Sequence, residues 1–282
     1  MDITASKVME LREMTGAAMM DCKKALNEAE GDFEKAKEIL RKKGQTIVLK
    51  KLSREAKEGL ISIASTKKGE KIDHLAVLKL ACETDFVARN EKFQALQTEL
   101  TQLLLKNGKD GFGKNMSQGE VKTKIEQAVS EFGENILIAE HHWFEAKEGY
   151  LGCYLHTNKK IATVVLGTTS SPSSLAHEEV FREIALHIAA NRVLALNQNQ
   201  IPKEEIEKER NLFREQLLAS DKKPDLVEKI VANKVEKFLS EVCLMEQPFL
   251  KNPDLKVKEW LQEQSKKLNT PFLVKEFFKI SF

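Results

Sequence analysis

The side chains that most often perform catalysis or bind metals form no active-site pattern in this sequence. The 282 residues contain no glycine-rich phosphate-binding motif, no serine-hydrolase motif and no His-Glu-x-x-His zinc motif. Two adjacent histidines, His141 and His142, are the nearest approach to a metal site. Neighbouring side chains on a strand point to opposite faces, so we expect one packed and one exposed ring rather than a shared ion. The sequence predicts no catalytic centre, no bound metal and no cofactor.

The cysteines also lack a pattern that would bind a metal or form a redox pair. They are widely separated, at Cys22, Cys82, Cys153 and Cys243. None lies in a Cys-x-x-Cys pair or at zinc-ligand spacing from a histidine, so we expect buried thiols in a reducing cytoplasm. The first residues do not resemble a signal peptide, and no run of about 18 apolar residues predicts a membrane span.

The segment Glu83–Asn90 is the most unusual short stretch of the chain. It reads Glu-Thr-Asp-Phe-Val-Ala-Arg-Asn and lies between a predicted strand and a predicted helix, a place where loops often carry function. It sets a large aromatic side chain, Phe86, beside a carboxylate, Asp85. Two interpretations are open at this point. Asp85 caps a helical turn and Phe86 packs into its own core, or the pair is exposed and serves a function.

The charge balance indicates a protein partner rather than a nucleic acid. Lysine and arginine number 45 against 43 aspartate and glutamate, a net charge of +2. Binding a polyphosphate requires many uncompensated cations. A short basic stretch contains Lys50, Lys51, Arg54 and Lys57. It lacks interleaved aromatics, and we interpret it as a linker rather than an RNA contact.

Residues 1–53 predict a small bundle of helices that could present one face to a partner. Three apolar runs have helical spacing: Val8 and Leu11, then Met19, Cys22, Leu26 and Ala29, then Phe33, Ala36 and Leu40. Gly16 and Gly31 separate the runs, and Asp32 is the expected N-cap of the third helix. Gly44 is expected to end that helix. The predicted core is thin, which leaves one face available.

Residues 54–146 and 147–282 predict two related subdomains. Each begins with a Glu-Gly pair, Glu58-Gly59 and Glu148-Gly149, and continues as strand, turn, strand and helix. The first unit has strands near 60–63 and 75–81 and a helix over 91–105. The second has strands over 150–155 and 161–166 and a helix over 177–190, whose apolar face carries His187. From its spacing alone, we expect this histidine to be a half-buried side chain whose polar atoms are satisfied within the fold. A helix over 121–132 and a strand over 136–144 lie between them. The predicted fold class is α+β, with a small antiparallel sheet backed by helices in each subdomain.

Residues 203–243 predict an antiparallel helical hairpin inserted in the second subdomain. Each arm has one apolar face: Ile206, Phe213 and Leu217 on the first, and Val227, Val231, Val235, Phe238 and Val242 on the second. Pro224 is placed to begin the second arm, and the short connection favours antiparallel packing. The segment 254–282 predicts a final helix and then a strand that returns to the second sheet.

Two long motifs resemble the elongation factor Ts family. Residues 11–26 resemble its N-terminal signature, and residues 84–90 resemble its second signature. Residues 133–136, 186–190 and 247–249 also match, whereas Ala18 and Asn191-Arg192-Val193 depart from the family pattern. The resemblance follows nearly the whole chain in order. It implies a ubiquitin-associated-like N-terminal three-helix domain, two similar core subdomains and a protruding helical hairpin.

The resemblance also implies a function and a set of contacts. The chain would bind elongation factor Tu carrying GDP, displace its Mg²⁺ and promote release of GDP so that GTP can bind, without being an enzyme and without a small-molecule substrate of its own. The residues implied in Mg²⁺ displacement are Thr84, Asp85, Phe86 and Val87. Further implied partner contacts are Arg12, Met19, Met20, Asn90 and His187.

Two other functions compete with this one. The chain could be an adaptor that joins a helical binding domain to a scaffold and leaves nucleotide untouched. It could also be an RNA-binding accessory of translation, which the net charge of +2 disfavours.

Overall fold

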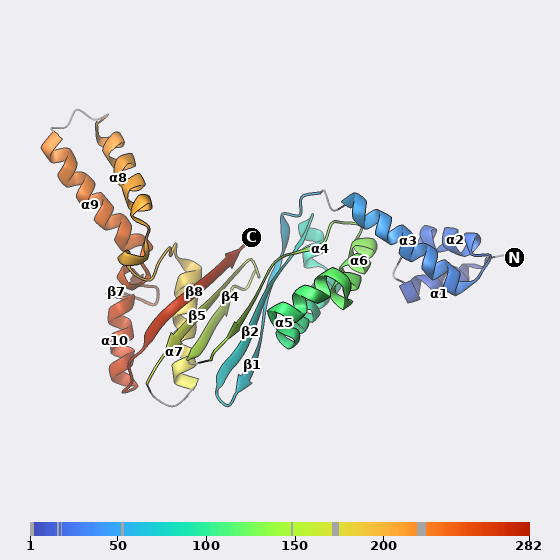
Figure 1. Ribbon diagram of the computed structural model, residues 1–282, viewed down its shortest axis with the longest axis horizontal. Coiled ribbons are helices and arrows are strands. Elements are labelled where there is room, and N and C mark those ends of the chain that lie inside the picture. Colours follow the sequence, from blue (N-terminus) through green and yellow to red (C-terminus); the bar gives the residue numbers. More distant parts are fainter. Residues whose placement is uncertain are drawn as a thin grey trace.

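The computed structural model describes residues 3–15, 17, 19–51, 54–147, 149–170, 175–218 and 224–282. The predicted break at Gly16, the family departure at Ala18 and Glu148 of the second Glu-Gly pair lie outside these residues. Three helices occupy one end of the elongated molecule, two sheets lie in the middle, and a helical hairpin projects from the other end (Figure 1). The predicted α+β fold class is confirmed.

The N-terminal bundle consists of α1 (Ala5–Thr15), α2 (Met19–Glu28) and α3 (Phe33–Lys51). Its core buries Leu11, Cys22 and Leu26, residues of the predicted apolar runs. Asp32 caps α3 as expected, because its carboxylate accepts hydrogen bonds from the backbone N–H groups of Glu34 and Lys35 at 2.9 and 3.1 Å.

The prediction that Gly44 ends α3 is wrong, since the helix continues to Lys51. An interior glycine costs a helix only about 1 kcal/mol relative to alanine. Packing of α3 against α6 can offset that cost.

The first sheet has the order β1-β2-β3 and is antiparallel throughout. Its strands are β1 (Glu58–Lys68), β2 (Lys71–Cys82) and β3 (Leu137–Glu145), and its helices are α4 (Asp85–Arg89), α5 (Glu91–Gln118) and α6 (Glu120–Phe132). One face packs against α5, where Phe93, Leu100 and Leu104 are fully buried. Helix α5 extends beyond the predicted end near residue 105, with a kink at Gly108.

The second sheet repeats this arrangement with the order β4-β5-β8. Its strands are β4 (Tyr150–Leu155), β5 (Ile161–Thr168) and β8 (Leu273–Ser281), and it is covered by α7 (Leu175–Ala190). Helix α10 (Val257–Lys267) adds Val257 and Leu261 to the same core. The C-terminal strand β8 pairs antiparallel with β5, so the predicted return of the chain end to this sheet is confirmed. Phe181 and Phe93 are both fully buried, although Phe181 is the seventh residue of α7 whereas Phe93 is the third residue of α5.

The inner faces of the two sheets pack on each other. Ile61, Leu75 and Val77 of the first sheet join Leu151 and Val164 of the second in one apolar cluster. The core therefore has four layers, helix, sheet, sheet and helix.

A pair of glycines supports the predicted relationship between the two units. Gly59 and Gly149 both have positive φ, +141° and +143°, and a Cβ on either would lie within 2.4 Å of a backbone carbonyl oxygen on the central strand. Each sheet thus has a glycine with positive φ where its first strand begins, Gly59 within β1 and Gly149 directly before β4.

The projecting hairpin consists of α8 (Lys203–Leu218) and α9 (Pro224–Val242). The predicted faces meet in a cluster that contains Phe213, Leu217, Val227, Val231 and Val235. Short 3-10 turns at Gln198–Gln200 and Leu244–Glu246 and a small two-stranded sheet of β6 (Pro248–Phe249) and β7 (Asn252–Lys256) join the hairpin to the second subdomain.

Candidate functional site

The second signature motif folds as the five-residue helix α4, held at its start by Thr84. The Thr84 backbone is extended, and its hydroxyl oxygen accepts a hydrogen bond from the Val87 N–H at 3.4 Å. Asp85 is the first residue of the helix rather than its cap. The interpretation of Asp85 as the cap is therefore wrong, because the preceding threonine already supplies the capping oxygen.

Phe86 projects away from the core. Its side chain is 81% exposed, whereas Ala88 is buried and Val87 is partly buried against the core of the first subdomain. The interpretation of Phe86 as a core residue is wrong. Burial of such a side chain in a complex would contribute about 1.5–3 kcal/mol, which makes it an efficient anchor for a partner.

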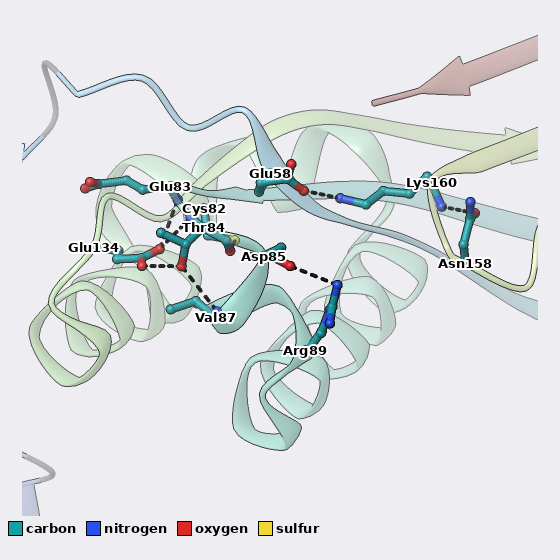
Figure 2. Close-up of polar contacts among 10 residues, drawn as sticks. All are labelled: Glu58, Cys82, Glu83, Thr84, Asp85, Val87, Arg89, Glu134, Asn158 and Lys160. Carbon is teal, nitrogen blue, oxygen red and sulfur yellow. Dashed lines mark hydrogen bonds and ion pairs between the residues drawn. The ribbon is translucent and has the colours of Figure 1, made fainter.

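Asp85 and Arg89 form an ion pair across one turn of α4, with Nη2 and Oδ2 2.9 Å apart (Figure 2). The two side chains are 44% and 80% exposed. A solvent-exposed pair of this kind stabilises a helix by only about 0.3–0.5 kcal/mol. A partner can therefore break it and use either charge at little cost.

A groove lies between the N-terminal bundle and the beginning of α5. Its volume is about 710 Å³, and it is lined by Met9, Arg12, Glu13, Ala17, Met19, Asn90, Lys92, Glu131 and Phe132. The structure thus brings together Arg12, Met19 and Asn90, which the resemblance implied as separate contacts. Asn90 is also the N-cap of α5, where its side-chain oxygen accepts a hydrogen bond from the Lys92 N–H at 2.9 Å.

The surface of the bundle adds methionines that the sequence analysis did not select. Met9 and Met14 are 53% and 55% exposed, comparable to Met19 and Met20 at 45% and 62%. Methionine side chains adapt to irregular binding surfaces. The sequence could have indicated their exposure, because both methionines lie outside the predicted apolar runs. An apolar residue that is not on the buried face of a helix must face solvent.

His187 does not reach the surface. Its ring is fully buried, its Nδ1 accepts a hydrogen bond from the Leu250 N–H at 3.2 Å, and its Nε2 lies 2.8 Å from the Gln247 side-chain oxygen. The backbone donor fixes Nδ1 as the unprotonated nitrogen, so Nε2 carries the proton. The side chain therefore joins α7 to the 247–250 segment and, in this conformation, cannot make the direct partner contact that the resemblance implied.

This burial predicts a pH dependence of stability. Burial lowers the pKa of His187, only partly opposed by its hydrogen bond to Gln247. The unfolded chain therefore binds the proton first as the pH falls, and the free energy of unfolding decreases as the pH drops below the ordinary histidine pKa of about 6.5. In chemical denaturation from about pH 7.5 to 5.5, we expect a shallower slope for His187→Gln than for the parent chain. Equal slopes would show that the ring titrates alike in both states.

The remaining candidate reactive groups are structural. All four cysteines are free, and burial raises the pKa of Cys82 to about 12 and that of Cys153 to about 11, which disfavours the reactive thiolate. His141 packs against Phe112, and His142 packs against Phe278 with ring centroids 4.1 Å apart. Both histidines are half-buried, so the expectation of one exposed ring is corrected.

Among the residues that the structure describes, no group of three His, Cys, Asp or Glu side chains could hold a metal ion. No helix within the same residues is long and apolar enough to cross a membrane.

Comparison with known proteins identifies the family. The family model described as Elongation factor TS matches residues 83–280. The chain is 40% identical to Elongation factor Ts of Aquifex aeolicus, with 93% of each chain covered. It is 36% identical to Elongation factor Ts of Lawsonia intracellularis, covering 99% of this chain and 98% of the relative, and 35% identical to that of Prosthecochloris aestuarii, covering 98% and 97%. The chain therefore belongs to the elongation factor Ts family.

Proposed function

We propose that this chain is the guanine nucleotide exchange factor of elongation factor Tu. It binds the GDP-bound GTPase, displaces Mg²⁺ and promotes release of GDP so that GTP can bind. The observation that carries the proposal is Phe86, which is 81% exposed beside the carboxylate of Asp85 on a short capped helix. No covalent bond is made or broken, so the activity is not that of an enzyme in the chemical sense.

The proposed mechanism is distortion of the loops that hold the nucleotide and its ion. In a GTPase, Mg²⁺ joins protein loops to the phosphates, which lie in a nest of backbone N–H groups. We assign residues 84–87, here named the wedge, to intrude beside this site, with Asp85 and Phe86 displacing the loops that hold the ion. Coupling is reciprocal, because a factor whose binding is weakened by nucleotide must weaken nucleotide binding equally.

The wedge alone cannot supply the free energy needed to speed GDP release. A thousandfold faster release needs about 4 kcal/mol from the barrier, at roughly 1.4 kcal/mol per decade. Burial of one phenylalanine yields about 1.5–3 kcal/mol. The rest must come from binding elsewhere, and we assign it to a grip formed by residues 1–53 and to the core subdomains 54–146 and 147–282. The groove that contains Arg12, Met19 and Asn90 joins the grip to the core next to the wedge.

The proposed setting is the cytoplasm, where translation elongation takes place, and the proposed partner is a protein. The net charge of +2 gives no basis for direct nucleic-acid binding. No cofactor or small-molecule substrate is required by this mechanism.

Release of labelled nucleotide tests the proposal. Elongation factor Tu loaded with fluorescent GDP is mixed with excess unlabelled GDP and increasing amounts of the chain in a stopped-flow instrument. We expect the release rate to rise with the concentration of the chain and then to saturate. Formation of a complex without faster release would instead support the adaptor function. Absence of any complex would contradict both.

The hairpin is predicted to be dispensable for the exchange step. Its arms α8 and α9 bury their apolar faces mainly against each other, so the hairpin can shorten without opening the core. Removal of equal lengths from both arms beyond Phe213 and Val231 is expected to change the maximal release rate by less than about twofold. Melting temperature serves as the control for folding. A large loss of exchange in a shortened chain that melts normally would contradict this prediction.

A further inference from the structure

We propose that Glu134 is a positioning residue that sets the direction of the wedge, an inference that rests on the exchange function proposed above. Glu134 lies in the connection between α6 and β3, far along the chain from residues 84–87. Its carboxylate nevertheless makes the main side-chain contacts to the start of α4 (Figure 2).

The carboxylate of Glu134 accepts three hydrogen bonds from the residues immediately before α4. Its Oε2 accepts from the backbone N–H groups of Glu83 and Thr84, both at 3.0 Å. Its Oε1 accepts from the Thr84 hydroxyl at 2.5 Å. An ionised carboxylate only accepts hydrogen bonds, and bonds to it are stronger than those between neutral groups.

These bonds fix α4 because so short a helix cannot fix itself. Helix α4 has five residues, and the first N–H groups of a helix have no partner within it. The Thr84 hydroxyl connects Glu134 to the first turn of α4, since it donates to the Glu134 carboxylate and accepts from the Val87 N–H. Glu134 therefore holds the cap in the rotamer that starts the helix, and the direction of the helix determines where Phe86 points.

Residues 133–135, in the segment between α6 and β3, also contact the end of the N-terminal bundle. The Asn135 N–H donates to the Glu83 carboxylate at 2.6 Å, and the Asn135 side-chain amide donates to the Arg54 carbonyl at 2.7 Å. The ammonium of Lys51, the last residue of α3, donates to the Gly133 carbonyl. Residues 133–135 thus contact the wedge, the linker and the end of the bundle. We assign them as the anchor that sets the wedge relative to the grip.

Glu134 is expected to affect nucleotide exchange more than the stability of the fold. Glu134 is only half-buried, and the side chain whose direction it controls, Phe86, is 81% exposed and contributes little to the core. Loss of Glu134 should therefore loosen a surface turn while the core, the bundle and the groove remain. Its effect on exchange should depend on the presence of Phe86, and a double-mutant cycle measures that dependence.

The test compares Glu134→Ala, Phe86→Ala and the double variant in full-length chains. With Phe86 present, Glu134→Ala is expected to lower the maximal GDP release rate about fivefold, while the half-saturating concentration changes less than about twofold. In the Phe86→Ala background, the same change should cost less than about twofold. Glu134→Gln, which keeps an acceptor for the backbone N–H groups, should recover more than about half of the rate. Glu120→Ala, an exposed residue of α6 that is ion-paired with Lys124, is the matched control and should leave the rate unchanged.

The outcomes separate this inference from the proposed function. If the parent chain releases GDP but the effects of Glu134→Ala and Phe86→Ala multiply, Glu134 acts elsewhere and the inference is wrong. A rise in half-saturating concentration with a normal maximal rate would also overturn it. If the parent chain fails to release GDP, the proposed function itself is wrong. Should Glu134→Ala not fold, the cycle is run with Glu134→Asp, whose shorter side chain retracts the acceptor, and the same non-multiplicative pattern is required.

Discussion

Phe86→Ala is expected to slow GDP release from elongation factor Tu about tenfold or more at saturating factor, a loss of at least about 1.4 kcal/mol of barrier lowering. The reason is that the 81% exposed ring of Phe86 is available to become buried against the partner, and alanine cannot replace that contact. The melting temperature should stay close to that of the parent chain, because little of the ring is buried in the free protein. Stopped-flow release and thermal melts on the same preparation measure the two effects.

Two control variants make the Phe86 result specific. Phe93→Ala empties a fully buried site in α5 and should destabilise the fold by about 3–5 kcal/mol, the pattern expected of a core phenylalanine. Leu212→Ala removes another exposed apolar side chain, 47% exposed on the hairpin, and should alter neither measurement. A Phe86→Ala chain that melts early but, while folded, releases GDP at the parent rate would show that the residue only packs.

The companion variant Asp85→Ala should lower the free energy of unfolding by less than the loss of a helix cap would. Thr84 supplies the capping oxygen, so Asp85→Ala removes only the exposed ion pair with Arg89, worth about 0.3–0.5 kcal/mol. Any clear loss of exchange in this variant therefore reports on the partner rather than on the fold.

The spacing of apolar residues predicted the helices and strands, because burying one face of a helix or strand requires apolar side chains at regular intervals. The strand over 150–155 and the return of the C-terminal strand to the second sheet both follow from apolar patterns, and both are confirmed. The end of α3 was not predictable in this way. A glycine such as Gly44 is compatible with either a cap or a helix interior, and packing against a distant helix, α6, favours the interior here.

The candidate site was predicted in its residues but not in its geometry. Motif resemblance selected Phe86, yet only the structure shows that the ring is exposed. The same resemblance selected His187, whose apolar surroundings place it inside the core. Glu134 was missed as a site residue because its hydrogen bonds join positions 50 and 51 residues apart, which no local pattern encodes. The match of residues 133–136 to the family was the available signal.

Removal of residues 1–53 is expected to weaken binding to elongation factor Tu by about a hundredfold or more, equivalent to about 2.7 kcal/mol. The truncated chain loses Arg12 and Met19 from the groove and the exposed methionines of the bundle, including Met20. Burial of even two such side chains against a partner could account for a loss of this size, at about 1.5–3 kcal/mol each. The half-saturating concentration in the GDP release assay measures the effect.

The truncated core itself should remain folded, which makes the experiment decisive. Beside the contact of α3 with α6, a cavity of about 300 Å³ lies between the bundle and α6, and the α6 side chains that line it are polar: Thr123, Glu126, Gln127 and Ser130. Truncation therefore uncovers a largely hydrophilic helix face there. The wedge and Glu134 are retained, so the maximal release rate at high concentration should fall much less than the affinity. A folded core that exchanges nucleotide at low concentration as well as the full chain would contradict the assignment of residues 1–53 as the grip, and the binding energy would then have to come from the two sheets and their helices alone.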